Sequence, residues 1–135
     1  MKSKCLLQLF MLLFAVSTFA QTGVAAKTPE VIIVDLQLDA YNSRDIDRFV
    51  ATFSEDIELY DETGKLTTKG HQQLRERYEG FFNNTPNLHC HIENRIIINN
   101  KVIDKERVTA NERIIEAVAI YEVTGGKIVK VTFVK

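Results

Sequence analysis

Two acidic residues on one predicted strand are the first candidates for chemistry in this chain of 135 residues. Asp104 and Glu106 are two residues apart in a segment of alternating pattern, so a strand points both side chains to the same face. Two carboxyls that share a cavity raise the pKa of one of them, which suits acid–base catalysis. The alternative is a structural ion-pair network with nearby arginines, which is a common role for buried acids.

Asp61 is another candidate, at the end of a short strand predicted over residues 57–61. Alternation places Asp61 on the same face as Ile57 and Leu59, both of which we expect to be buried. A carboxylate in an apolar cavity has a raised pKa and can act as a proton-transfer base. The alternative is that Asp61 caps the turn formed by the next four residues.

A third group, His89, His91 and Glu93, shares one face of a predicted strand over residues 88–98. Two imidazoles and a carboxylate at this spacing form a weak candidate metal site. No further histidine is near in the sequence, so we expect neither a metal nor another cofactor.

The loop after this strand decides which side chains face the acids. A three-residue loop pairs Ile98 with Val102 and points Asn94 inward as a ligand-binding candidate. A two-residue loop instead places Arg95 opposite Asp104. We favour the three-residue loop, because it joins the apolar faces of the two strands.

The elements that position these residues form one predicted α+β domain over residues 28–135. Apolar residues at helical spacing predict three helices, and period-two patterns predict six strands. The helices cover about residues 29–42, 45–53 and 70–83, and the strands 57–61, 66–68, 88–98, 102–112, 114–124 and 127–134. Short connections make the last four strands antiparallel neighbours in a curved sheet, with the helices packed on one face.

Residues 1–20 have the features of a secretory signal peptide, with two early lysines, an apolar run and a small-residue cleavage site after Ala20. An uncleaved signal anchor is the alternative. We therefore expect a secreted or periplasmic protein that is not membrane-bound after cleavage, with residues 21–27 as a flexible lead-in. Without residues 1–20, which contain two lysines and no acid, the net charge is about −3. This charge and the lack of a basic run argue against binding to nucleic acid.

Four segments in this order carry a resemblance to a known family: residues 40–47 (AYNSRDID), 53–61 (FSEDIELYD), 70–78 (GHQQLRERY) and 119–128 (AIYEVTGGKI). They resemble the nuclear transport factor 2-like superfamily, and within it the SnoaL-like and ketosteroid-isomerase-like branch. The similarity spans about residues 30–134. It implies a conical barrel of three N-terminal helices on a curved, mainly antiparallel sheet, with a pocket between them and a homodimeric assembly.

The resemblance also implies roles for single residues. Asp61 falls where ketosteroid isomerases have their general base. The two oxyanion-hole positions fall on Gln37 and Ala119, and an alanine side chain cannot donate a hydrogen bond. This departure argues against ketosteroid isomerase activity. Tyr41, one helical turn after Gln37, is either a substitute donor or a core residue.

These observations favour an exported SnoaL-like domain that binds a small, largely apolar molecule in its pocket. The candidate pocket residues are Gln37, Tyr41, Tyr78, Asn94 and Ala119. One alternative is an isomerase or hydratase that uses Asp61 as base, with Asp104 or Glu106 as the partner acid. The other alternative is a non-catalytic dimeric interaction module.

Overall fold

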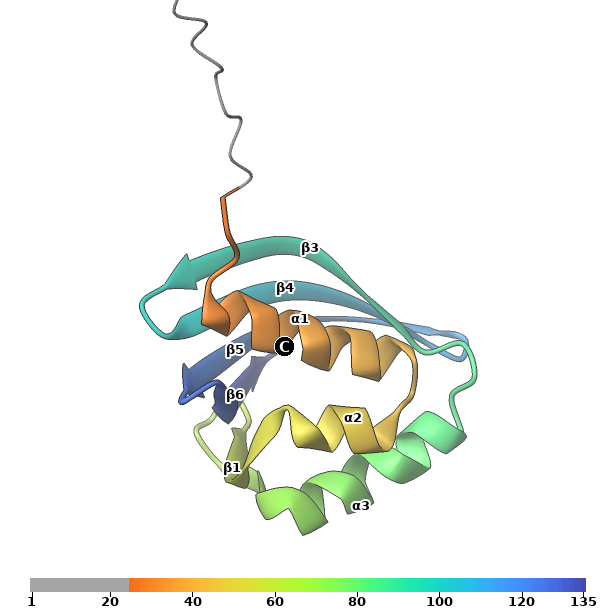
Figure 1. The fold of residues 1–135 in the computed structure, drawn as a ribbon. Coiled ribbons are helices and arrows are strands. Elements are labelled where there is room, and N and C mark those ends of the chain that lie inside the picture. The colour runs from red at the N-terminus through yellow and green to blue at the C-terminus, as the bar shows by residue number, and fades with distance from the viewer. Residues whose placement is uncertain (1–24) are drawn as a thin grey trace, which may run out of the picture.

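The computed structural model describes residues 25–135, which form three helices and six strands (Figure 1). The predicted signal peptide and most of the lead-in lie outside these residues. The helices are α1 (Pro29–Asn42), α2 (Ile46–Ala51) and α3 (Gly70–Asn83). The strands are β1 (Phe53–Tyr60), β2 (Leu66–Lys69), β3 (His89–Ile98), β4 (Lys101–Ala110), β5 (Arg113–Thr124) and β6 (Lys127–Val134).

Local capping fixes where the helices begin. The Thr28 hydroxyl accepts a hydrogen bond from the Val31 amide, and Pro29 is the first residue of α1. Asp45 caps α2 through the amide of Arg48, at 3.0 Å. α2 is shorter than predicted, because the chain is already extended from Phe53. No helix within residues 25–135 has the length and apolar content that spanning a bilayer requires.

The sheet has the strand order β2-β1-β6-β5-β4-β3 and is curved, with the three helices on one face (Figure 1). β6 runs parallel to β1, and every other neighbouring pair is antiparallel. The predicted α+β class and mainly antiparallel sheet are confirmed. The helices are not all N-terminal to the sheet, since β1 and β2 precede α3. The conical shape stays a prediction.

The favoured pairing of the β3–β4 hairpin is wrong. A two-residue turn at Asn99 and Asn100 pairs Ile97 with Val102 and places Arg95 opposite Asp104. Asn99 has a φ of 53°, a left-handed conformation that asparagine tolerates in tight turns. An irregularity between Ile92 and Asn94 then reverses which side chains face inward along the rest of β3. Single-strand alternation could not reveal this reversal.

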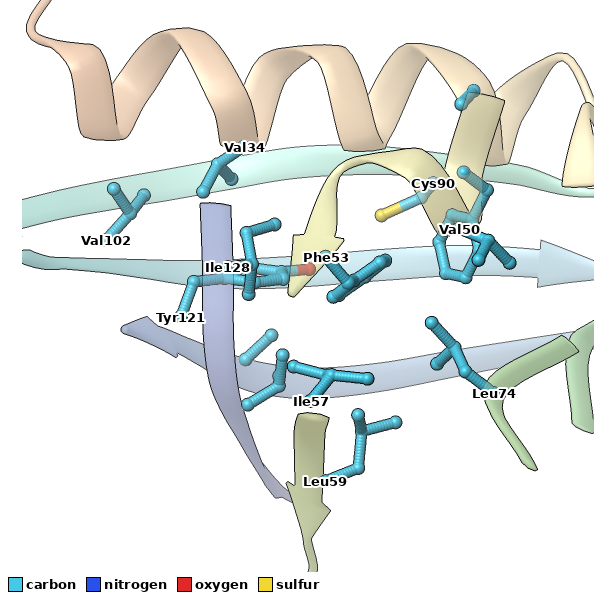
Figure 2. Close-up of a cluster of buried hydrophobic side chains, with 14 of the residues drawn as sticks. Val34, Val50, Phe53, Ile57, Leu59, Leu74, Cys90, Val102, Tyr121 and Ile128 are labelled. Atoms are coloured by element: carbon cyan, nitrogen blue, oxygen red, sulfur yellow. The ribbon is translucent and has the colours of Figure 1, made fainter. Parts of the chain in front are cut away.

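The core lies between the helices and the concave face of the sheet. Figure 2 shows part of it, including Val34 from α1, Leu74 from α3 and Ile128 from β6. Each of these three side chains is fully buried. At one end of the core, aromatic rings from all three helices pack together, with Phe49 and Phe82 centroids 5.3 Å apart.

Asn42, at the end of α1, connects this helix to the edge strand β3 through two hydrogen bonds. Its side-chain amide donates to the Cys90 carbonyl at 3.0 Å and accepts from the Cys90 amide at 2.7 Å. β3 is an edge strand, so these backbone groups have no strand partner on that side. The side chain therefore takes the place of a neighbouring strand at this point.

We predict that Asn42→Ala lowers the free energy of unfolding by about 2–4 kcal/mol, because two hydrogen bonds are lost and partly buried backbone groups are left unpaired. Urea denaturation followed by circular dichroism measures the change. Asn94→Ala is the matched control, since Asn94 is exposed on the outer face of the same strand, and it changes stability by less than about 0.5 kcal/mol. An equal change in the free energy of unfolding in the two variants would contradict the stabilising role of the Asn42 hydrogen bonds to Cys90.

Candidate functional site

Two adjoining cavities lie between the helices and the sheet. The inner one has a volume of about 60 Å³. Its lining is mainly aromatic and aliphatic, with few polar groups: Gln37, Leu38, Tyr41, Phe49, Phe53, Leu59, Tyr78, Cys90, Glu106, Tyr121, Val131 and Phe133. The outer cavity has a volume of about 550 Å³ and is more open to solvent. Tyr41, Tyr78, Glu106 and Phe133 line both, so the two spaces meet at these side chains.

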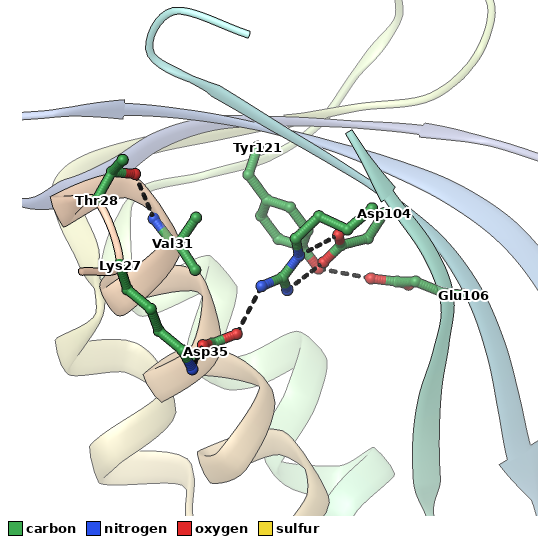
Figure 3. Close-up of polar contacts among 8 residues, drawn as sticks. Lys27, Thr28, Val31, Asp35, Asp104, Glu106 and Tyr121 are labelled. Atoms are coloured by element: carbon green, nitrogen blue, oxygen red, sulfur yellow. Dashed lines mark hydrogen bonds and ion pairs between the residues drawn. The ribbon is translucent and has the colours of Figure 1, made fainter. Parts of the chain in front are cut away.

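The acids Asp104 and Glu106 both point inward from β4, as predicted, but they have different partners (Figure 3). Arg95 donates to both oxygens of Asp104, at 2.6 and 2.8 Å. The same guanidinium donates to Asp35 of α1 at 2.6 Å. Asp104 is 1% exposed and lines neither cavity. It therefore has the structural role that the sequence left open as the alternative for these acids.

Within the part of the chain that the structure describes, no cation pairs with Glu106. Its Oε1 accepts a hydrogen bond from the Tyr121 hydroxyl at 2.7 Å, and the side chain borders both cavities. Burial raises the pKa of Glu106 to about 7, with a smaller upward contribution from Asp104, while the Tyr121 hydrogen bond and Arg95 act in the opposite direction. Glu106 can therefore gain or lose a proton near neutral pH.

Two further polar groups border the inner cavity without a protein partner. Among residues 25–135, no hydrogen bond involves the side-chain amide of Gln37 or the hydroxyl of Tyr41. Burial raises the pKa of Tyr41 far above its usual value, so this phenol stays neutral. Both groups were predicted as pocket residues, and the structure places both beside Glu106 in the inner cavity.

Asp61 lies at the edge of the outer cavity and not in an apolar interior. Its Oδ1 accepts hydrogen bonds from the Thr63 hydroxyl at 2.6 Å and from the Thr63 and Lys65 amides at 3.0 Å. These contacts, the Thr63 hydroxyl foremost, lower the pKa of Asp61. The raised pKa expected for this residue is wrong, and the side chain caps the β1–β2 turn.

Other predicted pocket residues divide between the cavity and the rest of the fold. Tyr78 lines both cavities, and burial raises its pKa to about 12. Ala119 is fully buried opposite Asp104, but it borders neither cavity. Asn94 pairs with Lys105 on the outer face and is exposed, because the two-residue turn places Arg95, and not Asn94, on the inner face. Its predicted inward position is wrong.

The weak metal candidates His89, His91 and Glu93 are all exposed. Glu93 forms an ion pair with Lys105 at 2.8 Å. Within residues 25–135, no three His, Cys, Asp or Glu side chains are arranged to hold a metal ion.

Tyr121 is the site residue that sequence reasoning missed. It lies on the inner face of β5, four residues after Ala117, which pairs with Glu106. The small side chains of Ala117 and Ala119 leave room for the tyrosine ring to reach along the strand toward Glu106. A tyrosine next to alternating alanines, on the strand that faces the acids, is the signal that could have indicated this contact.

A family model for the SnoaL-like domain matches residues 34–131, which is most of the chain. The chain belongs to the SnoaL-like family. The resemblance seen in the sequence is therefore confirmed. No curated protein sequence matches this SnoaL-like chain.

Solved structures share the fold of this SnoaL-like protein at low sequence identity. An uncharacterized cystatin fold protein from Novosphingobium aromaticivorans matches with a TM-score of 0.73 and 22% identity, over 81% of this chain and 100% of that one. A candidate SnoaL-like polyketide cyclase from Jannaschia sp. CCS1 matches with a TM-score of 0.66 and 16% identity, over 84% and 89%. A computationally designed 17-OHP binder matches with a TM-score of 0.71 and 12% identity, over 80% and 91%.

The burial of Glu106 predicts a specific dependence of stability on pH. The pKa is raised from 4.5 to about 7 in the folded state, so the folded protein binds this proton more tightly than the unfolded chain. The stabilisation from protonated Glu106 is complete below pH 4.5 and is lost as the pH rises through 7. Glu106→Gln cannot ionise, so the variant should gain about 3 kcal/mol relative to the natural protein between pH 4.5 and 8.

Urea denaturation of both proteins across this pH range measures that difference, and contributions from other groups cancel in it. Glu116→Gln is the matched control, because Glu116 is exposed and pairs with Arg107 on the outer face. A difference between Glu106→Gln and the natural protein that does not change with pH would show that Glu106 has no raised pKa.

Proposed function

We propose that this SnoaL-like protein binds a small, largely apolar molecule in the two adjoining cavities. The observation that carries the proposal is an aromatic-lined space with a few inward polar groups, Glu106 and Gln37 among them, that the protein leaves with unused hydrogen-bonding capacity. Sites for small molecules have this composition, in which apolar walls supply affinity and a few polar groups fix orientation. The designed 17-OHP binder indicates that this fold can be adapted to hold a small molecule.

The size of the space agrees with this proposal. The outer cavity, at about 550 Å³, is within the range of small-molecule sites, whereas the inner one accepts only the end of a molecule. A ligand would lie with its bulk against Phe81, Ile115 and Phe133 and its narrow end toward Glu106. Apolar contact over most of the ligand would supply the affinity.

Export is part of the same proposal. It is supported by Lys2 and Lys4, the apolar run up to Ala20 and the small residues at positions 18 and 20. The proposed mature protein begins at Gln21 and is secreted or periplasmic.

We also propose that the protein forms a homodimer through the outer face of the sheet. Ile96, Ile103 and Ile120 are laterally paired across β3, β4 and β5 on this face. Ile96 is 59% exposed, and Ile98 and Val134 are exposed on the same face. An exposed apolar row of this kind, flanked by charged residues, is typical of a protein interface.

Native mass spectrometry of the protein expressed with its own leader and purified from the exported fraction tests the proposal. We expect a dimer in which each subunit begins at Gln21 and carries an additional small-molecule mass. The bound mass should be lost or strongly reduced in Phe133→Asp, which puts a charge into the wall of both cavities. Ile120→Asp on the outer face is the control for this cavity change, and it should give monomers that still carry the ligand.

Each part of the proposal has its own contradictory outcome. A full-length mass in the cell fraction would overturn export, and a monomeric natural protein would overturn the dimer. A protein that emerges without an additional mass, and that binds no apolar probe, would overturn the binding function in favour of a simple interaction module.

A second candidate function is proton transfer, as in an isomerase or hydratase. It is favoured by the position of Glu106 in the cavity and by its pKa of about 7, which suits a group that accepts and returns a proton. Asp61 is a weaker choice than it was from sequence, because its pKa is lowered by the turn that it caps.

Incubation of the recovered ligand with the protein in D₂O separates the two functions. Proton transfer predicts deuterium at a carbon of the ligand in the natural protein and at least a tenfold slower incorporation in Glu106→Gln. A ligand that keeps its original mass while it stays bound would exclude this second function and leave simple binding.

A further inference from the structure

The inner cavity has an unusual charge balance. Among residues 25–135, Glu106 is the only side chain lining this cavity that ionises near neutral pH, and no lysine, arginine or histidine of this part of the chain lines it. The neighbouring Arg95 is paired with Asp104 and Asp35, and it lines neither cavity. A ligand that enters this space therefore meets one acidic group and no cation.

Asp104 and Glu106, two residues apart on β4, differ in whether a cation pairs with them. Asp104 binds a guanidinium with both of its oxygens. Among residues 25–135, no basic nitrogen lies within 4.0 Å of the Glu106 carboxyl, whose one protein contact is the Tyr121 hydroxyl on Oε1. The second oxygen of Glu106 is thus a strong acceptor without a partner from the described chain. A buried carboxylate in this position is stabilised by any cation that can reach it.

The walls around Glu106 are also suited to positive charge. Rings of Tyr41, Phe49 and Tyr78 line the inner cavity and pack against one another, with centroids 4.7 Å apart for Phe49 and Tyr78. The faces of aromatic rings attract ammonium groups, more strongly where water is excluded. The faces of these rings do not attract an anion, because the ring faces carry negative potential.

We propose that the inner cavity takes the protonated amino end of an otherwise apolar molecule, with Glu106 as its counter-ion. An alkylammonium has three N–H donors. Three residues that line the inner cavity can supply acceptors for it: Glu106 its free oxygen, Gln37 its amide oxygen and Tyr41 its hydroxyl oxygen. The inference rests on the proposed binding function, because it names the class of ligand for the same site.

Other ligand ends satisfy this cavity less well. An alcohol can donate one hydrogen bond to Glu106, but it leaves the carboxylate without a counter-charge. A carboxylate end would lie beside Glu106 with no cation between them, and the two negative charges would repel.

Three matched naphthalene compounds test the inference: 2-(2-naphthyl)ethylamine, 2-(2-naphthyl)ethanol and 3-(2-naphthyl)propionate. Isothermal titration calorimetry at pH 8, where Glu106 is ionised, compares their binding to the full protein. We expect the amine to bind at least ~10-fold more tightly than the alcohol, and the carboxylate to bind most weakly. An alcohol or a carboxylate that binds as tightly as the amine would overturn the inference.

Glu106→Gln removes the charge while it keeps the shape and the Tyr121 hydrogen bond. This substitution should weaken the binding affinity for the amine by ~10-fold or more and change the affinity for the alcohol by less than ~3-fold. Glu116→Gln, which removes an exposed carboxylate on the outer face, should leave all three affinities unchanged. Retention of full amine affinity in Glu106→Gln would overturn the inference even if the amine is the tightest ligand.

The failure of this inference can be told from the failure of the proposed function. Absence of binding by all three compounds would overturn both. Binding of the alcohol at least as tightly as the amine would leave a small-molecule site of different chemistry and overturn only the inference about the amine. Circular dichroism of Glu106→Gln confirms that the variant is folded, which its predicted gain in stability at pH 8 supports.

Discussion

The site depends on one guanidinium that pairs with two acids and leaves the buried carboxyl of Glu106 to a phenol. Arg95 points inward from β3 and neutralises Asp104 through Nε and Nη2, while its Nη1 donates to Asp35 on α1. This contact ties the helix to the sheet and consumes the positive charge available there. Glu106, two residues further along β4, is left with a phenol as its partner, and its carboxyl therefore faces the cavity in a form that can be charged or neutral.

The position of Arg95 in turn depends on the backbone of β3. The two-residue turn at Asn99 and Asn100 places Arg95 opposite Asp104 on the inner face and Asn94 on the outer one. With the register that the sequence favoured, Asn94 would have faced the buried acids of β4. Arg95 would then have lain on the outer face of the sheet. The irregularity between Ile92 and Asn94 then places Ile92, and not Glu93, opposite Glu106.

The helices and long strands could be predicted from sequence, because their signals are local. Thr28 and Pro29 indicate the start of α1, and the Gly125–Gly126 pair indicates the turn between β5 and β6. The parallel pairing of β1 with β6 had no local signal, since it joins segments about seventy residues apart. Inward-facing Asp104 and Glu106 followed from alternation alone. Their different partners did not, because these depend on the length of the β3–β4 turn and on the reach of Tyr121 past two alanines.

The place of β6 in the sheet has a consequence for the order in which the chain can assemble. β6 is the last strand in the sequence, yet it lies between β1 and β5 and is the link between the β1–β2 side and the three-strand meander. Until β6 has been synthesised, these two parts have no hydrogen-bonded connection within the sheet. The six-stranded sheet can therefore close only when β6 is available to pair with both β1 and β5.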